Sequence, residues 1–247
     1  MTVHVPGQDG TAQQGASVAG TSRAGRLPPG WSKVLVIVAH PDDESFGLGA
    51  IVSLMTATGA AVHILCYTHG EASTLNENDT DLDQEREAEL QQASTELAAA
   101  TVTLLDYPDG GLAAIPPPEL AAHAVELAAR HRPDGVLVFD DTGITCHPDH
   151  QAATRAAVQA ATAAGLPVLA WALPAAIADR LRAETGQPFT GQPPDCLDLC
   201  VRVDRTRQRR AALMHASQIS PAAVLWRRLQ LQGDCEHLRW LLPPPTA

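Results

Sequence analysis

The chain has 247 residues, of which 45% are hydrophobic and 18% charged, a composition that suits one large folded domain and excludes disorder throughout. Its formal net charge of −11 argues against nucleic acid as a partner, because binding to phosphate backbones draws on clustered Lys and Arg. No stretch is long and apolar enough to span a bilayer, and the N-terminus lacks the apolar core of a secretion signal. We therefore predict a cytoplasmic protein that binds neither nucleic acid nor membrane.

Residues 1–30 differ in composition from the rest of the chain. They are rich in Gly, Ala, Ser, Thr and Gln without hydrophobic periodicity, which predicts a flexible leader. The remaining residues, 31–247, are predicted to form a single domain. Nothing in the sequence fixes the oligomeric state, and a homo-oligomer is compatible with it.

Apolar strands alternate with helices along this domain. We predict strands at 34–38, 61–68, 101–106, 135–140, 166–173 and 196–203. Helices are predicted at 45–58, 83–99, 119–132, 148–164 and 205–216, with further helical material up to residue 242. Such regular alternation indicates right-handed crossovers, and hence an α/β, Rossmann-like three-layer fold with a mainly parallel central sheet. A strand order of 3-2-1-4-5 would place the first and fourth strands side by side at the switch point.

Polar residues crowd together where the first strand ends, in the sequence His40-Pro41-Asp42-Asp43-Glu44. Pro41 cannot donate a ladder hydrogen bond, so the strand stops there and the next side chains lie above the sheet edge, where open α/β sheets bind ligands. Adjacent carboxylates at a sharp turn point in different directions. One can therefore ligate a metal while the other accepts a proton. The alternative is that the acidic residues only favour the helix N-terminus.

A second polar cluster follows the fourth strand and contains His147, Asp149 and His150. His147 and His150 are three residues apart at the start of a helix, so they share a face. If the strand order is as predicted, both clusters meet in one crevice.

Five cysteines, an odd number without a C-x-x-C pair, argue against a disulfide framework. Cys146 precedes His147 and offers a thiol to a metal, although packing is the better interpretation.

The motifs AHPDDES, starting at Ala39, and HPDH, starting at His147, resemble the signature of the zinc-dependent N-acetylglucosaminyl-phosphatidylinositol de-N-acetylases, also called PIG-L or LmbE-like deacetylases. Shorter matches follow the same order, in Thr68-His69-Gly70-Glu71, RxxEL from Arg86, DGGL from Asp109, and HxSQ from His215 to Gln218. The resemblance runs from about Lys33 to Gln218.

Site roles follow from this chemistry and from the resemblance. We predict that His40, Asp43 and His150 bind one Zn²⁺, because two imidazoles and one carboxylate are a common catalytic set and the family's ligands fall on the same positions. Asp42, beside the metal but not bound to it, is the expected general base. His147 is expected to stabilise the tetrahedral oxyanion and to help protonate the leaving amine.

The resemblance also implies a substrate class. In this family an arginine and an aspartate at the positions of Arg86 and Asp109 contact substrate hydroxyls. The expected substrate is therefore a small molecule, an N-acetylated amino sugar or a natural-product biosynthetic intermediate, that loses an acyl group from its amine. A thiol conjugate or a non-sugar amide is the alternative substrate. A non-catalytic module that binds a metal or a nucleotide sugar is the rival function, although no G-x-G-x-x-G motif supports it.

Overall fold

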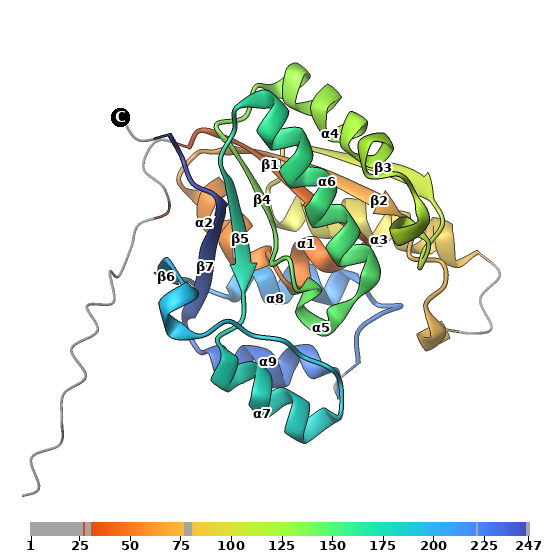
Figure 1. The fold of residues 1–247 in the computed structure, drawn as a ribbon. Coiled ribbons are helices and arrows are strands. Elements are labelled where there is room, and N and C mark those ends of the chain that lie inside the picture. The colour runs from red at the N-terminus through yellow and green to blue at the C-terminus, as the bar shows by residue number, and fades with distance from the viewer. Residues whose placement is uncertain (1–26, 28–30, 77–80, 221, 246–247) are drawn as a thin grey trace, which may run out of the picture.

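The computed structural model describes residue 27 and residues 31–76, 81–220 and 222–245. The predicted leader, apart from Leu27, lies outside the described residues. The described part builds a seven-stranded sheet between helices, which confirms the predicted α/β, Rossmann-like architecture with a mainly parallel sheet (Figure 1).

The strands of the sheet follow the order β3-β2-β1-β4-β5-β7-β6. They are β1 (Lys33–Val38), β2 (Ala61–Thr68), β3 (Thr101–Tyr107), β4 (Gly135–Phe139), β5 (Val168–Ala172), β6 (Leu199–Arg202) and β7 (Cys235–Leu242). Strands β1 to β5 pair in parallel, whereas β7 runs antiparallel to both β5 and β6. The predicted order 3-2-1-4-5 is confirmed, and β1 and β4 are neighbours.

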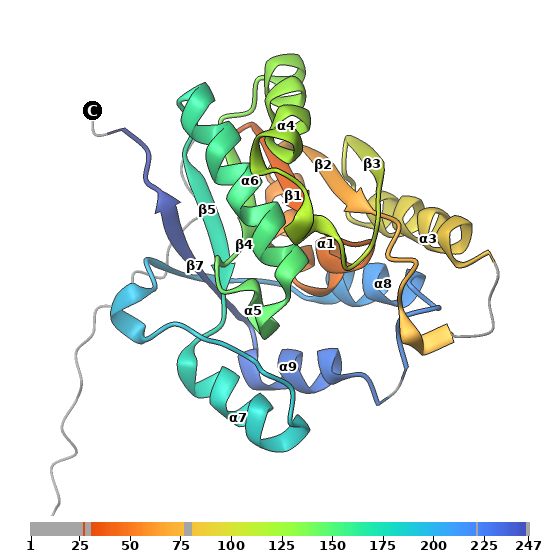
Figure 2. The same cartoon turned by 45° about the vertical axis from the view of Figure 1, so that its right-hand side comes forward.

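Helices cover both faces of this sheet. They are α1 (Asp43–Phe46), α2 (Gly49–Ala57), α3 (Leu82–Glu96), α4 (Pro117–His131), α5 (Gly143–Cys146), α6 (Pro148–Ala164), α7 (Ala175–Thr185), α8 (Thr206–Met214) and α9 (Val224–Gln232). Helices α4 and α6 lie on one face and α2, α3 and α8 on the other, while α7 and α9 lie beyond the carboxyl end of β5 (Figures 1 and 2). None of the helices in the described part of the chain has the length and apolar character that crossing a membrane requires.

Strand β1 explains why its sequence is apolar throughout. Val34, Val36 and Val38 pack into the core beneath α2, α3 and α8, whereas Leu35 and Ile37 pack against α4 and α6. All five side chains are at most 2% exposed. A strand buried on both faces needs no polar alternation, and its carboxyl end is the rigid base on which the first motif sits.

The structure corrects the prediction for the C-terminal segment. Residues 235–242, expected to be helical, form β7. The period-2 pattern was hidden because Glu236 occupies a core position, where it is fully buried. Its carboxylate accepts the Trp171 indole N–H at 2.6 Å and pairs with Arg205. A charged residue that is neutralised internally looks solvent-facing in the sequence.

Cysteine pairing also depends on this strand. The sequence argued against a disulfide framework, yet Cys200 on β6 and Cys235 on β7 are joined by a disulfide. They are 35 residues apart and become neighbours only through the antiparallel pairing that the sequence did not reveal. Cys146 instead lies with its Sγ 3.2 Å from the Thr190 hydroxyl oxygen.

Candidate active site

The two polar motifs meet at the carboxyl ends of β1 and β4. The ring centroids of His40 and His147 are 4.8 Å apart, and those of His147 and His150 are 4.7 Å apart. Asp43 lies between the motifs, with Oδ1 3.2 Å from Nε2 of His150. The predicted convergence of two distant segments in one crevice is thus what the structure shows.

Asp43 is buried and fully engaged. Its Oδ2 accepts the backbone N–H groups of Ala39, at 3.2 Å, and His40, at 3.0 Å, which closes the turn after β1. Burial by itself raises the pKa of Asp43, but the charges and hydrogen bonds of His150 and His40 hold this pKa well below its usual value. The side chain is therefore a fixed carboxylate at neutral pH.

The hydrogen bonding of His150 determines which ring nitrogen faces Asp43. Nδ1 lies 3.0 Å from the carbonyl oxygen of Gly143, so this nitrogen carries a proton and donates it. In the neutral ring the lone pair on Nε2 then faces the Asp43 carboxylate, which is also an acceptor. Either a proton or a metal cation must lie between them.

His40 is surrounded by carboxylates. Its Nδ1 is 3.6 Å from Asp43 Oδ2, and its Nε2 is 3.1 Å from Asp109 Oδ1 and 3.4 Å from Asp149 Oδ2. Burial lowers the pKa of His40, but the hydrogen bonds to these three carboxylates outweigh burial and hold the pKa well above its usual value of 6.5. Three carboxylates around one buried imidazole attract positive charge to this point.

Two groups of potential ligands can be drawn around His40. One comprises His40, His147 and His150, and the other comprises His40, Asp109 and Asp149; within each group the ligand atoms lie within 4.8 Å of one another. The predicted set of His40, Asp43 and His150 shares the two histidines with the first group. Its third member, Asp43, contacts both of these histidines. Asp43 approaches Nδ1 of His40, whereas Asp109 and Asp149 approach Nε2, so the two carboxylate groups lie on different sides of this ring.

His147 is the N-cap of α6. Its Nδ1 accepts the backbone N–H of Asp149 at 3.2 Å, so the proton of the neutral ring resides on Nε2. Burial lowers the pKa of His147, and the neighbouring His150 and His40 lower it further. A neutral imidazole with its proton on Nε2 can donate a hydrogen bond, and the catalytic role of His147 stays a prediction.

Asp149, for which the sequence gave no firm role, links the second motif to the turn after β3. This fully buried carboxylate accepts the N–H groups of Gly110, at 2.7 Å, and Leu112, at 3.1 Å, and contacts His40. It thereby fixes the position of Asp109 in the same turn.

Asp42 has different partners from Asp43. Its backbone is left-handed, with φ 117° and ψ −29°, and its N–H donates to Glu44 Oε2 at 2.9 Å. Its Oδ2 lies 3.1 Å from the Arg86 guanidinium. Burial raises the pKa of Asp42 to about 6, even though Arg86 opposes the shift. As predicted for adjacent carboxylates, Asp42 and Asp43 diverge, and only Asp42 has the pKa of a group that exchanges protons near neutrality.

Arg86 holds the turn that contains Asp42 through buried hydrogen bonds. Its side chain is 4% exposed and donates to the carbonyl oxygens of Gly70, at 2.5 Å, and Pro41. A Cβ at position 70, where φ is +67°, would lie 2.2 Å from Arg86 Nη1, so glycine is required there. The predicted substrate contact of Arg86 stays a prediction, whereas its contacts with the Asp42 turn are direct. Asp109 is also in place, accepting the N–H of Ala72 at 3.0 Å.

We expect Arg86→Ala to lower the free energy of unfolding by about 3 kcal/mol, because it leaves a largely buried carboxylate and two carbonyl groups without their donor. Urea unfolding measures this loss. The control is Arg130→Ala, which removes an exposed pair with Glu126 and should cost less than about 1 kcal/mol. Equal stabilities of the two variants would mean that Arg86 is not structural.

A buried pair behind Asp42 was not assigned from the sequence, although His215 lies in the HxSQ match. His215 Nε2 is 2.8 Å from Glu44 Oε1, and both side chains are fully buried. The second oxygen of Glu44 accepts the Asp42 N–H. Through this carboxylate, the segment after α8 braces the backbone of the predicted base.

The Glu44–His215 pair predicts a pH-dependent stability. Burial lowers the pKa of His215, but the charge and hydrogen bond of Glu44 outweigh burial and raise this pKa above 6.5. A raised pKa in the folded state means that the stabilisation is complete below about pH 6.5 and is lost as pH rises through the folded value. The difference in unfolding free energy between the wild type and His215→Gln should therefore be larger at pH 6 than at pH 9. An equal difference at both pH values would contradict the pairing.

Comparisons with known proteins match the same segments. The family model for GlcNAc-PI de-N-acetylase (PIG-L) matches residues 35–161. A Salinispora arenicola protein named 1D-myo-inositol 2-acetamido-2-deoxy-alpha-D-glucopyranoside deacetylase is 29% identical over 78% of this chain and 78% of its own length. A Catenulispora acidiphila protein of the same name, numbered 1, is 31% identical over 58% of this chain, which spans about half (52%) of that relative's length.

Among solved structures, a conserved protein of Thermus thermophilus is 27% identical to this chain with a TM-score of 0.63. The match covers 88% of this chain and 97% of that one.

Proposed function

The chain belongs to the GlcNAc-PI de-N-acetylase (PIG-L) family, and we propose that it is a zinc-dependent hydrolase. Its proposed reaction removes an acetyl group from the amine of an N-acetylated amino sugar. The proposal rests on one observation. Two hydrogen-bond acceptors, Asp43 Oδ1 and His150 Nε2, face each other at 3.2 Å, next to His40. A metal cation there satisfies both atoms and offsets the surrounding carboxylates.

The donor set fits zinc. Two imidazoles and one carboxylate are a common three-ligand catalytic set that leaves a fourth position open. Ligand bonds of about 2.0 to 2.1 Å in a tetrahedron place the ligand atoms about 3.3 Å apart. The observed separation of 3.2 Å between Asp43 Oδ1 and His150 Nε2 lies close to that value. His40 approaches the other oxygen of Asp43, Oδ2, with its Nδ1 at 3.6 Å. The hydrogen bond from His150 to Gly143 supplies the outer contact that orients a metal-binding imidazole.

The bound zinc ion would supply Lewis-acid polarisation of the amide carbonyl and lower the pKa of the attacking water. Asp42, whose pKa is raised to about 6, takes the proton of that water. His147 donates a hydrogen bond from Nε2 to the oxygen that becomes negative. The proton that Asp42 took from the water then passes to the leaving amine, directly or through His147 Nε2 as that nitrogen gives up its own proton, so that Asp42 and His147 both return to their starting states. Arg86 holds the Asp42 carboxylate in position.

The substrate assignment is supported by the two relatives, whose names describe the deacetylation of a 2-acetamido-2-deoxyglucopyranoside of inositol. We propose a small N-acetylglucosaminide as the substrate. Asp109, with an 11% exposed side chain next to His40, is the carboxylate that would accept a sugar hydroxyl. A natural-product intermediate that carries the same acetamido sugar would present the same groups.

The test is hydrolysis of a panel by zinc-loaded protein, with release of free amine as the measurement. The panel contains N-acetylglucosaminides with different aglycones and N-acyl amines without a sugar, and Asp42→Asn is the inactive control. We expect activity on the glucosaminides. Activity confined to non-sugar amides would contradict the sugar while leaving the amidase intact. No hydrolysis by protein that contains zinc would instead favour the non-catalytic module.

A further inference from the structure

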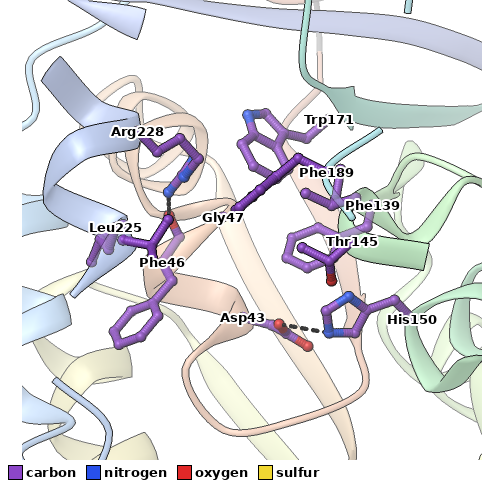
Figure 3. A pocket seen from close by; sticks show the side chains of 12 residues that line it. Asp43, Phe46, Gly47, Phe139, Thr145, His150, Trp171, Phe189, Leu225 and Arg228 are labelled. Atoms are coloured by element: carbon purple, nitrogen blue, oxygen red, sulfur yellow. Dashed lines mark hydrogen bonds and ion pairs between the residues drawn. The ribbon is translucent and has the colours of Figure 1, made fainter. Parts of the chain in front are cut away.

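A pocket adjoins the predicted metal site and is not used by the mechanism above. Its cavity volume is about 170 Å³, it is open to solvent on one side, and its lining includes Asp43 and His150. Figure 3 shows these two side chains at one end of the pocket, with Trp171 and Arg228 towards the other. Most of the remaining lining is apolar: Phe46, Phe139, Ile144, Phe189, Val224 and Leu225. An apolar pocket with a catalytic set at its entrance is a typical substrate subsite.

The pocket and the predicted sugar-binding carboxylate lie on different sides of the site. Asp109 and Asp149 contact Nε2 of His40, whereas Asp43 approaches Nδ1 of the same ring. The other oxygen of Asp43 faces His150, and Asp43 and His150 both border the pocket. An amide has two halves that leave its carbonyl carbon in different directions. If the amine half lies towards Asp109, the acyl half points into the pocket.

Aromatic packing keeps the walls of the pocket apolar. The Phe139 ring lies edge-on to His150, with centroids 5.0 Å apart, and 5.3 Å from the ring of Trp171. Phe139 also fills the space above Gly47, where a Cβ would lie 2.2 Å from its ring. These contacts hold the wall in one conformation beside the predicted metal ligand.

Arg228 closes the far end and is already occupied. Its guanidinium carbon lies 4.7 Å from the ring centre of Trp171, and its N–H groups donate to the carbonyl oxygen of Phe46 and, at 2.8 Å, to Gln232. The side chain is 5% exposed, and burial lowers its pKa to about 10. The guanidinium packs against an aromatic face and its N–H groups are bonded within the protein. It therefore forms the closed end of the pocket and is not available to bind an anion.

We propose that this pocket is an acyl subsite, and that besides acetyl it takes unbranched aliphatic acyl chains such as butyryl or hexanoyl. The inference rests on the proposed amidase function and deepens it. An acetyl group would place one methyl at the entrance, next to His150 and Phe139, and leave the apolar surface beyond it uncovered. Each further methylene would be transferred from water to that surface.

The test uses zinc-loaded protein and glucosamine that carries N-acetyl, N-propionyl, N-butyryl or N-hexanoyl groups. We expect kcat/KM to rise about fourfold for each buried methylene, the value that corresponds to ~0.8 kcal/mol. A kcat/KM that is highest for acetyl and falls with chain length would overturn the acyl subsite while leaving the deacetylase intact. No hydrolysis of any member of the series would contradict the proposed function itself.

A pair of matched variants tests whether the acyl chain binds in this pocket. Val224→Phe adds volume inside the pocket, and Val125→Phe makes the same change on α4, where the side chain is 41% exposed and outside the pocket. We expect Val224→Phe to lower the butyryl-to-acetyl ratio of kcat/KM at least fourfold, and Val125→Phe to leave the ratio unchanged. An unchanged ratio in Val224→Phe would place the acyl chain elsewhere.

Discussion

Replacing His40 by alanine is expected to reduce the zinc content of the purified protein from about one equivalent to a small fraction, and to abolish amide hydrolysis. His40 is buried, lies 3.6 Å from Asp43 and is surrounded by three carboxylates that favour a cation. Loss of an outer contact alone typically weakens metal binding by about 10- to 100-fold, so loss of a ligand should exceed that range. Metal analysis of protein purified without added zinc or chelator gives the content directly.

Two histidine variants serve as controls for this experiment. His131→Ala removes an imidazole that stacks on His63 far from the site and should leave the zinc content unchanged. His147→Ala should also keep zinc while lowering turnover, because its Nδ1 accepts a hydrogen bond and its proton resides on Nε2. Loss of zinc in His147→Ala would make His147 a ligand, and full zinc in His40→Ala would refute the predicted ligand set.

Asp42→Asn should retain zinc and lower kcat by about 100-fold or more, because the amide cannot take a proton from water. The substitution preserves shape, and its side-chain oxygen can still accept from Arg86, so the turn should remain folded. The measurement is the rate of amine release at saturating substrate, beside metal analysis of the same sample.

The matched control is Asp141→Asn, which removes a 55% exposed carboxylate paired with Arg239. We expect this variant to keep the kcat of the wild type. A fall in zinc content in Asp42→Asn would show that Asp42 is a ligand, and a kcat within a few-fold of the wild type would remove it from catalysis.

The sequence predicted the position of the site because the rules that place it are local or topological. An apolar run buried on both faces, Pro41 after it and the handedness of crossovers are enough to bring His40 and His150 to neighbouring strand ends. The contacts of the surrounding residues could not be predicted in this way. Asp149 reaches His40 only because the turn after β3 donates two N–H groups to the same carboxylate.

Burial of charged residues was equally hidden in the sequence. Arg86 and Glu44 are charged residues of a kind that usually lies on the solvated face of a helix. Both are buried here, because their partners come from distant segments of the chain. Glu236 misled the prediction of β7 for the same reason. Hydrophobic periodicity records which residues avoid water, and it fails where a charge is neutralised inside the protein.

The bond between Glu44 and His215 spans 171 residues of sequence. Contacts of such separation form late, because the entropy of closing a long loop opposes them until the intervening elements have assembled. During synthesis from the N-terminus, the HPDDE turn therefore emerges long before the residue that braces it. The turn after β1 should reach its final geometry only after α8 has folded against α2 and α3, so binding of the proposed metal is expected to be one of the last steps in maturation of the protein.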